Sequence, residues 1–162
     1  MKNLLFIPAL FLFFFISCNK DNNDDGLNTL KITEGGFAGY SHEFSPNLGF
    51  WSMVDANVRY VHLVLGDDSN LAMPAENVMS IVFYYNGSPQ VHFPSVEGQW
   101  ADFGINYDGA VYYFTPEDAT LSIIHFDDTK FEGTLSGVFS EMGNSSEKIS
   151  FSMRISLMMQ GI

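Results

Sequence analysis

The sequence predicts an all-β domain, an antiparallel β-sandwich of about 8–9 strands. Three observations predict it. Apolar and polar residues alternate with a period of two in the clearest segments, no segment sustains the 3.6-residue period of a helix, and the separators "NGSP", "YDG" and "FDD" carry turn-forming residues. The sandwich is favoured because several strands expose a polar face and nothing in the pattern demands a hollow interior.

The clearest strand runs from Lys148 to Leu157, and the turn-rich "EMGNSSE" joins it to another alternating segment, Lys130 to Phe139. The two segments predict a C-terminal hairpin in which Phe151 and Ile155 face the core. Seven further strands are predicted: Thr29–Thr33, Phe50–Asp55, Arg59–Leu65, Val78–Tyr85, Gln99–Tyr107, Ala110–Thr115 and Leu121–Phe126. The regular spacing of these short strands is also compatible with a lipocalin-like β-barrel, which is the alternative fold.

The N-terminus has the outline of a secretory signal. Lys2 supplies a positive charge, Leu4 to Ile16 is an apolar run interrupted only by Pro8, and Ser17 precedes Cys18, the only cysteine. Thirteen residues at about 1.5 Å each are too short to cross a hydrocarbon core of about 30 Å. We therefore predict that residues 1–17 target the chain and do not span a membrane.

The residues Phe15, Ile16, Ser17 and Cys18 resemble the lipobox of bacterial lipoproteins. That resemblance implies that Cys18 is lipidated, that residues 1–17 are removed, and that two or three acyl chains then hold the protein stably in a membrane. The alternative is an ordinary signal peptide, which would leave an unpaired thiol in an oxidising compartment. Lipidation would exclude Cys18 as a nucleophile, a disulfide partner or a metal ligand.

Residues 18–28 are predicted to be the lipidated cysteine and an acidic, flexible tether, because the segment has almost nothing to bury. Asp21, Asn23, Asp25 and Gly26 match the first half of a calcium loop, but the twelfth position holds Ile32 where a Glu is needed. An acidic run after the cysteine also resembles the export signal of surface lipoproteins in Gram-negative bacteria. It implies an outer-membrane lipoprotein, exposed at the surface, with the inward-facing orientation left open.

Residues 29–162 are predicted to form one domain with a sizeable core. The chain carries a net charge of −12 at pH 7, which argues against a nucleic-acid partner. In the C-terminal half, the pattern of Gly133, Thr134, Ser136 and Gly137 is similar to the closing strands of uncharacterised Gram-negative outer-membrane lipoproteins that carry a lipobox, an acidic tether and a single all-β domain. The resemblance implies a β domain at the cell envelope and brings no catalytic residues.

Sequence motifs for catalysis are missing: there is no G-x-S-x-G, H-E-x-x-H, P-loop or G-x-G-x-x-G. The four histidines, His42, His62, His92 and His125, lie on or beside different strands, so no metal site is predicted, and no cofactor. The pairs Asp67–Asp68 and Asp127–Asp128 fall in predicted turns, where Asp is favoured for local hydrogen bonding. A hydrolase using an unrecognised pair of carboxylates remains an alternative.

The candidate ligand site lies on the strand Gln99–Tyr107. Alternation places Phe103 and Ile105 toward the core and Trp100, Asp102 and Asn106 on the opposite face. An aromatic ring beside hydrogen-bonding groups is suited to a sugar or to a protein hot spot. The competing interpretation buries Trp100 under a loop or a neighbouring edge. Trp51, on the same face as Met53, is predicted to belong to the core.

The sequence as a whole therefore favours a lipid-anchored module of the cell envelope that binds a glycan or protein without catalysis. A structural subunit of a surface assembly, which would need an exposed apolar patch or an open strand edge, is the second candidate. The hydrolase is the third.

Overall fold

The computed structural model describes residues 26–66, 77–95 and 98–162, and the regular elements in these ranges are all strands. The ten strands are β1 (Thr29–Lys31), β2 (Ser41–Glu43), β3 (Pro46–Met53), β4 (Arg59–Gly66), β5 (Val78–Tyr85), β6 (Gln90–Phe93), β7 (Trp100–Tyr107), β8 (Ala110–Phe126), β9 (Lys130–Glu141) and β10 (Asn144–Gly161). The all-β prediction is confirmed. Cys18, the signal-like segment, most of the acidic tether and the pair Asp67–Asp68 lie outside the described residues.

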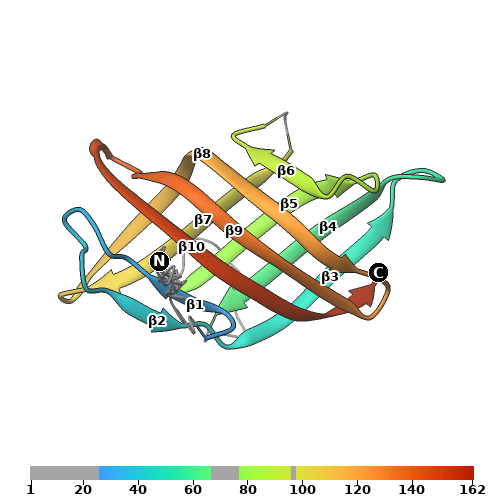
Figure 1. Cartoon of the computed structure of the whole chain (residues 1–162), viewed down its shortest axis with the longest axis horizontal. Helices are drawn as coiled ribbons and strands as arrows, with labels where there is room; N and C mark the ends of the chain where they lie inside the picture. Colours follow the sequence, from blue (N-terminus) through green and yellow to red (C-terminus); the bar gives the residue numbers. More distant parts are fainter. Residues whose placement is uncertain (1–25, 67–76, 96–97) are drawn as a thin grey trace, which may run out of the picture.

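Seven strands pair in a closed ring, in the order β3, β4, β5, β7, β8, β9, β10 and back to β3 (Figure 1). The predicted fold class included both a sandwich and a barrel, and this ring has the connectivity of a barrel. Its pairs are antiparallel except one, because the end of β10 runs parallel to β3, with Met159 opposite Gly49 and Gly161 opposite Trp51.

Strand β8 unites two of the predicted strands in one continuous element. One edge of β8 pairs with β9 along most of its length, while the other edge pairs first with β7 and then with the short β6. Strands β2 and β6, which are only three and four residues long, were not predicted from the sequence. Such short strands carry too few residues for alternation to be recognised.

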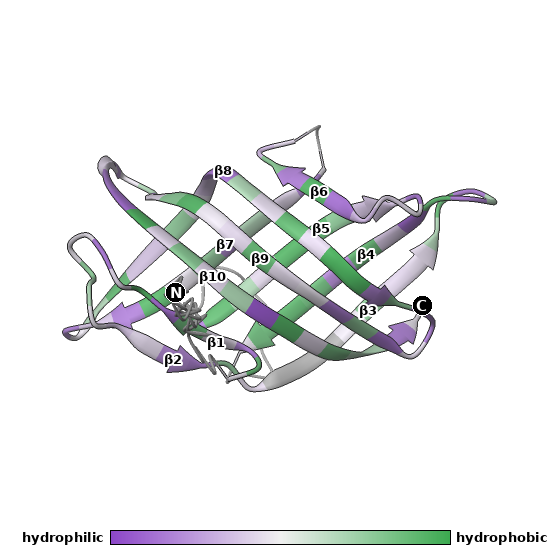
Figure 2. Cartoon of the chain, in the orientation of Figure 1, coloured by the Kyte–Doolittle hydropathy of each residue, from purple (hydrophilic) through white to green (hydrophobic). Residues whose placement is uncertain are grey.

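Side chains fill the inside of the ring, as expected for a small barrel. Seven phenylalanines are completely or almost completely buried in the core: Phe44, Phe83, Phe93, Phe103, Phe114, Phe131 and Phe139. The predicted inward set of β10 is buried throughout, including Phe151 and Ile155, and the alternation along β9 and β10 is visible in Figure 2. The described part of the core is therefore packed.

One end of the barrel is closed by the N-terminal hairpin of β1 and β2. Between these strands, Phe37 inserts its ring edge-to-face against Tyr107, Tyr112 and Phe114, with ring centroids 4.8 to 5.4 Å apart. Asn28 fixes the start of the hairpin, because its side chain exchanges two hydrogen bonds with the backbone of Ser156 on β10. The β3–β4, β5–β6 and β8–β9 turns lie at the other end, which we call the mouth.

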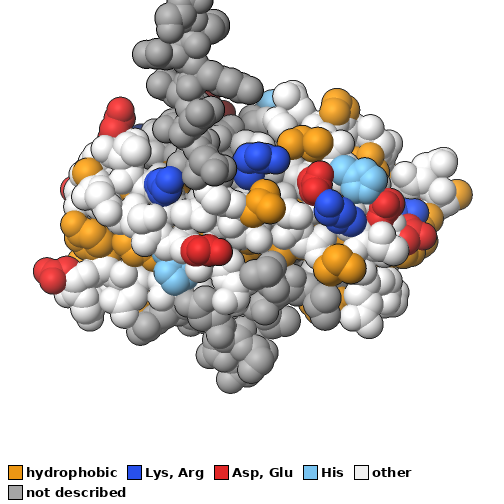
Figure 3. Space-filling model, turned by 60° about the horizontal axis from the view of Figure 1, so that its bottom comes forward, with side chains coloured by type: hydrophobic (Ala, Val, Ile, Leu, Met, Phe, Trp, Pro, Cys, Tyr) orange, Lys and Arg blue, Asp and Glu red, His pale blue; other side chains and the backbone are white. Residues whose placement is uncertain are grey.

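The surface mixes charges of both signs. On the face shown in Figure 3, Lys and Arg side chains are interspersed with Asp and Glu. In the described ranges there is no helix long and apolar enough to cross a membrane.

Candidate functional site

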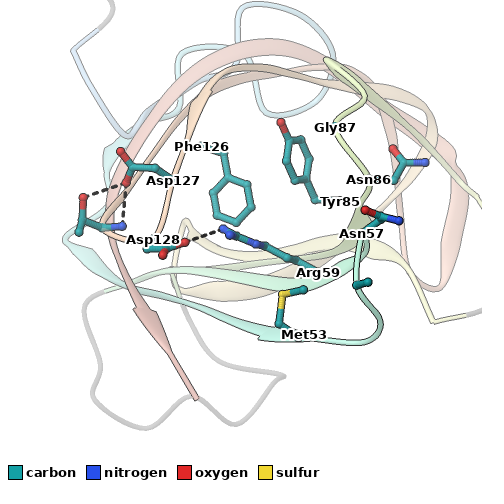
Figure 4. Close-up of a pocket in the computed structure, with 11 residues that line it drawn as sticks. Met53, Asn57, Arg59, Tyr85, Asn86, Gly87, Phe126, Asp127 and Asp128 are labelled. Atoms are coloured by element: carbon teal, nitrogen blue, oxygen red, sulfur yellow. Dashed lines mark hydrogen bonds and ion pairs between the residues drawn. The ribbon is translucent and has the colours of Figure 1, made fainter.

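The mouth of the barrel holds a pocket of about 730 Å³, open to solvent (Figure 4). This volume lies within the range of small-molecule sites, about 300 to 1,000 Å³. The side chains that matter most for its chemistry are Asn57, Arg59, Tyr85, Asn86, Phe126 and Asp128. They come from the ends of β4, β5 and β8 and from the turns that follow or precede these strands.

The pocket is the outermost layer of the barrel interior. On β4 the buried side chain of Val61 faces inward, so alternation places Arg59 on the same side, and its register partner on β5 is Tyr85. A β-bulge between Ile123 and His125 adds a residue to β8. The bulge returns Phe126 to the inward face, where Tyr85 meets it edge-to-face at 4.8 Å.

Arg59 is the central polar group of the pocket. Its guanidinium lies 4.5 Å from the ring centroid of Trp51 and 5.5 Å from that of Phe126, and its Nη1 is 2.8 Å from a carboxylate oxygen of Asp128. Its side chain is 29% exposed, so the cation–π contacts and the ion pair compensate a charge that is only partly hydrated. Trp51, predicted to be core, packs against the core at this end.

Each of the three turns at the mouth is fixed by an acidic or amide side chain that accepts backbone N–H groups. Asp55 accepts from Asn57 and Val58, and Asn86 accepts from Ser88. Asp127 accepts from the N–H groups of Thr129 and Lys130. These are the local hydrogen bonds for which Asx residues are favoured in turns, so the rim of the pocket is defined by sequence-local chemistry.

Asp127 is ionised over the whole physiological range. The backbone N–H of Thr129, its hydroxyl and the ring of His125 hydrogen-bond to the carboxylate and hold the pKa of Asp127 well below its usual value. A carboxyl group in that state accepts hydrogen bonds and is unsuited to act as a general acid.

The variant Asp127→Asn should therefore be less stable than the parent at neutral pH and lose this deficit in acid. A lowered folded-state pKa means that the stabilisation by Asp127 is complete above the unfolded value of about 3.9 and declines as the pH falls through that value and below. Urea unfolding of both proteins at neutral pH and near pH 2.5 measures the gap. A gap of equal size at both pH values would contradict this account.

The sequence-predicted site residues Trp100, Asp102 and Asn106 do lie on the outward side of β7, while Ala101, Phe103 and Ile105 are buried. None of the three lines the mouth pocket. Burial raises the pKa of Asp102. The backbone N–H of Asn106 donates to the side chain of Asn77. Ligand binding by these residues stays a prediction.

Trp100 combines exposure with a structural contact. The residue is 38% exposed, yet its indole N–H donates to the hydroxyl of Ser80, at 3.3 Å. Ser80 is nearly buried and also lies 2.9 Å from Nε2 of His62, whose pKa is lowered by burial. A neutral His62 can accept a hydrogen bond from the Ser80 hydroxyl, so the three side chains form one chain of hydrogen bonds across β4, β5 and β7.

We expect Trp100→Ala to cost about 1 to 2 kcal/mol, since it removes one hydrogen bond and part of a half-buried ring. Urea unfolding measures this loss. A destabilisation as large as that of a buried phenylalanine would place Trp100 in the core and remove it as a binding residue.

The four histidines lie on different strands, His42 on β2, His62 on β4, His92 on β6 and His125 on β8. His62 contacts Ser80, His92 contacts Thr120 and His125 contacts Asp127. Within residues 26–66, 77–95 and 98–162, no group of three or more His, Cys, Asp or Glu side chains is placed to hold a metal ion.

Sequence reasoning missed the mouth pocket, although part of its signal was visible. Extending the inward alternation of β4 by one step reaches Arg59, and "NGSP" and "FDD" were identified as turns. These three turns come together only because the strands close into a ring, and that closure could not be predicted from the sequence. Comparisons with protein-family models, curated proteins and solved structures find no match for this chain.

Proposed function

We propose that this protein is a lipid-anchored lipoprotein of the cell envelope whose barrel binds a ligand at its mouth without transforming it. The observation that carries the binding proposal is the asymmetry of the barrel. One end is plugged by Phe37, whereas the other ends in an open pocket with Arg59 at its centre. A barrel whose interior is packed, and which has a pocket lined by polar and aromatic side chains at one end, is suited to bind a ligand at that end.

Binding is favoured over hydrolysis by the state of the mouth carboxylates. A glycosidase needs a carboxylic acid that stays protonated near neutral pH beside a second carboxylate. Asp127 is held ionised by its hydrogen bonds, and Asp128 is engaged by Arg59. Both oxygens of Asp127 are already engaged within the turn, so Asp128 is the mouth carboxylate suited to accept hydrogen bonds from a ligand.

The anchoring part of the proposal rests on the sequence. The lipobox-like residues Phe15 to Cys18 precede an acidic segment that includes Asp21, Asp24 and Asp25. Lipid on Cys18 would hold the chain in the outer membrane, and the acidic segment would act as a spacer and export signal to the cell surface.

The substitution Cys18→Ser tests the anchor. We expect it to abolish metabolic labelling by a fatty acid and to release the protein from membranes, because no other described or predicted segment would hold it there. The parent protein should stay with membranes after a high-salt wash, which disrupts electrostatic attachment. Retained labelling, or unchanged sedimentation of the variant, would contradict the lipoprotein assignment.

A further inference from the structure

We propose that the mouth pocket recognises an uncharged saccharide. This inference rests on the proposed function, since it names the class of ligand for the same pocket. Three properties of the pocket carry it: the mixture of hydrogen-bond donors and acceptors, the balance of charge, and the aromatic floor.

The polar groups of the mouth match hydroxyl groups. Arg59 can only donate, Asp128 can only accept when ionised, and the side-chain amide of Asn57 can do both. Arg59 carries five N–H donors, and Asp128 is the one acceptor it contacts among the described residues. Figure 4 shows the Arg59 side chain reaching into the middle of the pocket. Asn57 lies in the turn just before β4, two residues from Arg59. A ligand rich in hydroxyls can satisfy donors and acceptors together.

The charge of the mouth disfavours an acidic ligand. The described pocket lining has two carboxylates, Asp127 and Asp128, and one guanidinium, that of Arg59. The guanidinium is already paired with Asp128, at 2.8 Å. The whole chain carries a net charge of −12 at pH 7, so its long-range electrostatic field also repels anions. A quaternary ammonium ligand is disfavoured for a different reason, because Arg59 already occupies the cation position beside the rings of Trp51 and Phe126.

The floor of the pocket supplies an apolar surface for a sugar ring. Phe126 and Tyr85 meet edge-to-face, with an interplanar angle of 89°. Both rings are only partly buried and pack against the core from the mouth side. The C–H bonds on one face of a pyranose carry partial positive charge and are attracted to the negative face of an aromatic ring. Tyr85 is the member of this pair that Arg59 does not cover, so it is the ring on which the sugar would stack. Hydroxyls at the ring's edge would then meet the polar rim.

The test uses the full-length lipidated protein in a detergent without a sugar headgroup, applied to an array of neutral oligosaccharides and of matched uronic-acid and sulfated ones. We expect binding to neutral oligosaccharides. Asn57→Asp should weaken it at least about tenfold, the loss expected when the amide N–H donor is removed and a ligand hydroxyl loses its hydrogen bond. The matched control is Asn144→Asp, which makes the same change at the exposed first residue of β10, at the closed end, and should bind like the parent.

The outcomes separate the ligand class from the proposed function. A preference for acidic oligosaccharides that is lost in Asn57→Asp would overturn the uncharged saccharide and leave the mouth as the binding site. If Asn57→Asp and Asn144→Asp bind neutral saccharides equally well, the mouth pocket is not the binding site. Failure of the parent protein to bind any neutral oligosaccharide on the array would also overturn the saccharide assignment.

Discussion

Phe151→Ala should lower the free energy of unfolding by about 3 to 5 kcal/mol, the range for deleting a buried aromatic side chain. The ring of Phe151 stacks on Phe139 at 4.7 Å and meets Phe103 edge-to-face at 5.4 Å, so its removal leaves a cavity between strands β7, β9 and β10. A single domain has roughly 5 to 15 kcal/mol of stability in all. The variant should therefore unfold at much lower urea concentration than the parent.

The neighbouring residue on the same strand gives a matched control. Ser152 is exposed on the opposite face of β10, and Ser152→Ala should change stability by less than about 0.5 kcal/mol. If Phe151→Ala and Ser152→Ala unfold at the same urea concentration, β10 does not have the register described here.

Gly137→Ala should destabilise the barrel by about 3 kcal/mol or more. Gly137 has φ of +148°, which side-chain-bearing residues rarely adopt, and an added Cβ would collide with the carbonyl oxygen of Asp118 and Cα of Ala119. These are backbone atoms of β8, so the contact can be relieved only by moving β9 away from β8. Backbone strain and overpacking each cost about 1 to 3 kcal/mol.

Gly143→Ala isolates the cost of the backbone conformation. Gly143 also has a positive φ, +108°, but nothing lies within 4 Å of the Cβ position. Thermal unfolding should rank the parent first, Gly143→Ala second and Gly137→Ala last. Equal midpoints for the two variants would show that the close approach of β8 and β9 at Gly137 is wrong.

The strands that the sequence predicted best are those with one face in the core and one in water. Val78–Tyr85 was predicted with its observed bounds, and β10 with its inward set, because alternation reports a half-buried strand directly. Ring closure escaped prediction since it depends on pairs far apart in the chain, such as β10 with β3. The positions of the bulges in β8 were equally invisible, because a bulge inserts a residue without any signal in composition.

The candidate site was harder to predict for the same reason. Trp100 was identified because a single strand decides which way it points. The mouth pocket needs Arg59, Tyr85 and Phe126, which belong to three strands and come together only when the barrel closes. The turn residues could be recognised locally, but their gathering at one end follows from the topology.

The most direct test of the account asks which tryptophan senses the ligand, since the chain has only two. Trp51 lies at the mouth against Arg59, and Trp100 lies on the outer wall against Ser80. Trp100→Phe leaves Trp51 as the only indole fluorophore, and Trp51→Phe leaves Trp100. Titrating each variant with the tightest-binding neutral oligosaccharide should change the emission of Trp51 and leave that of Trp100 unchanged. A saturable change in emission confined to Trp100 would contradict binding at the mouth pocket and would assign the site to the outer face of β7.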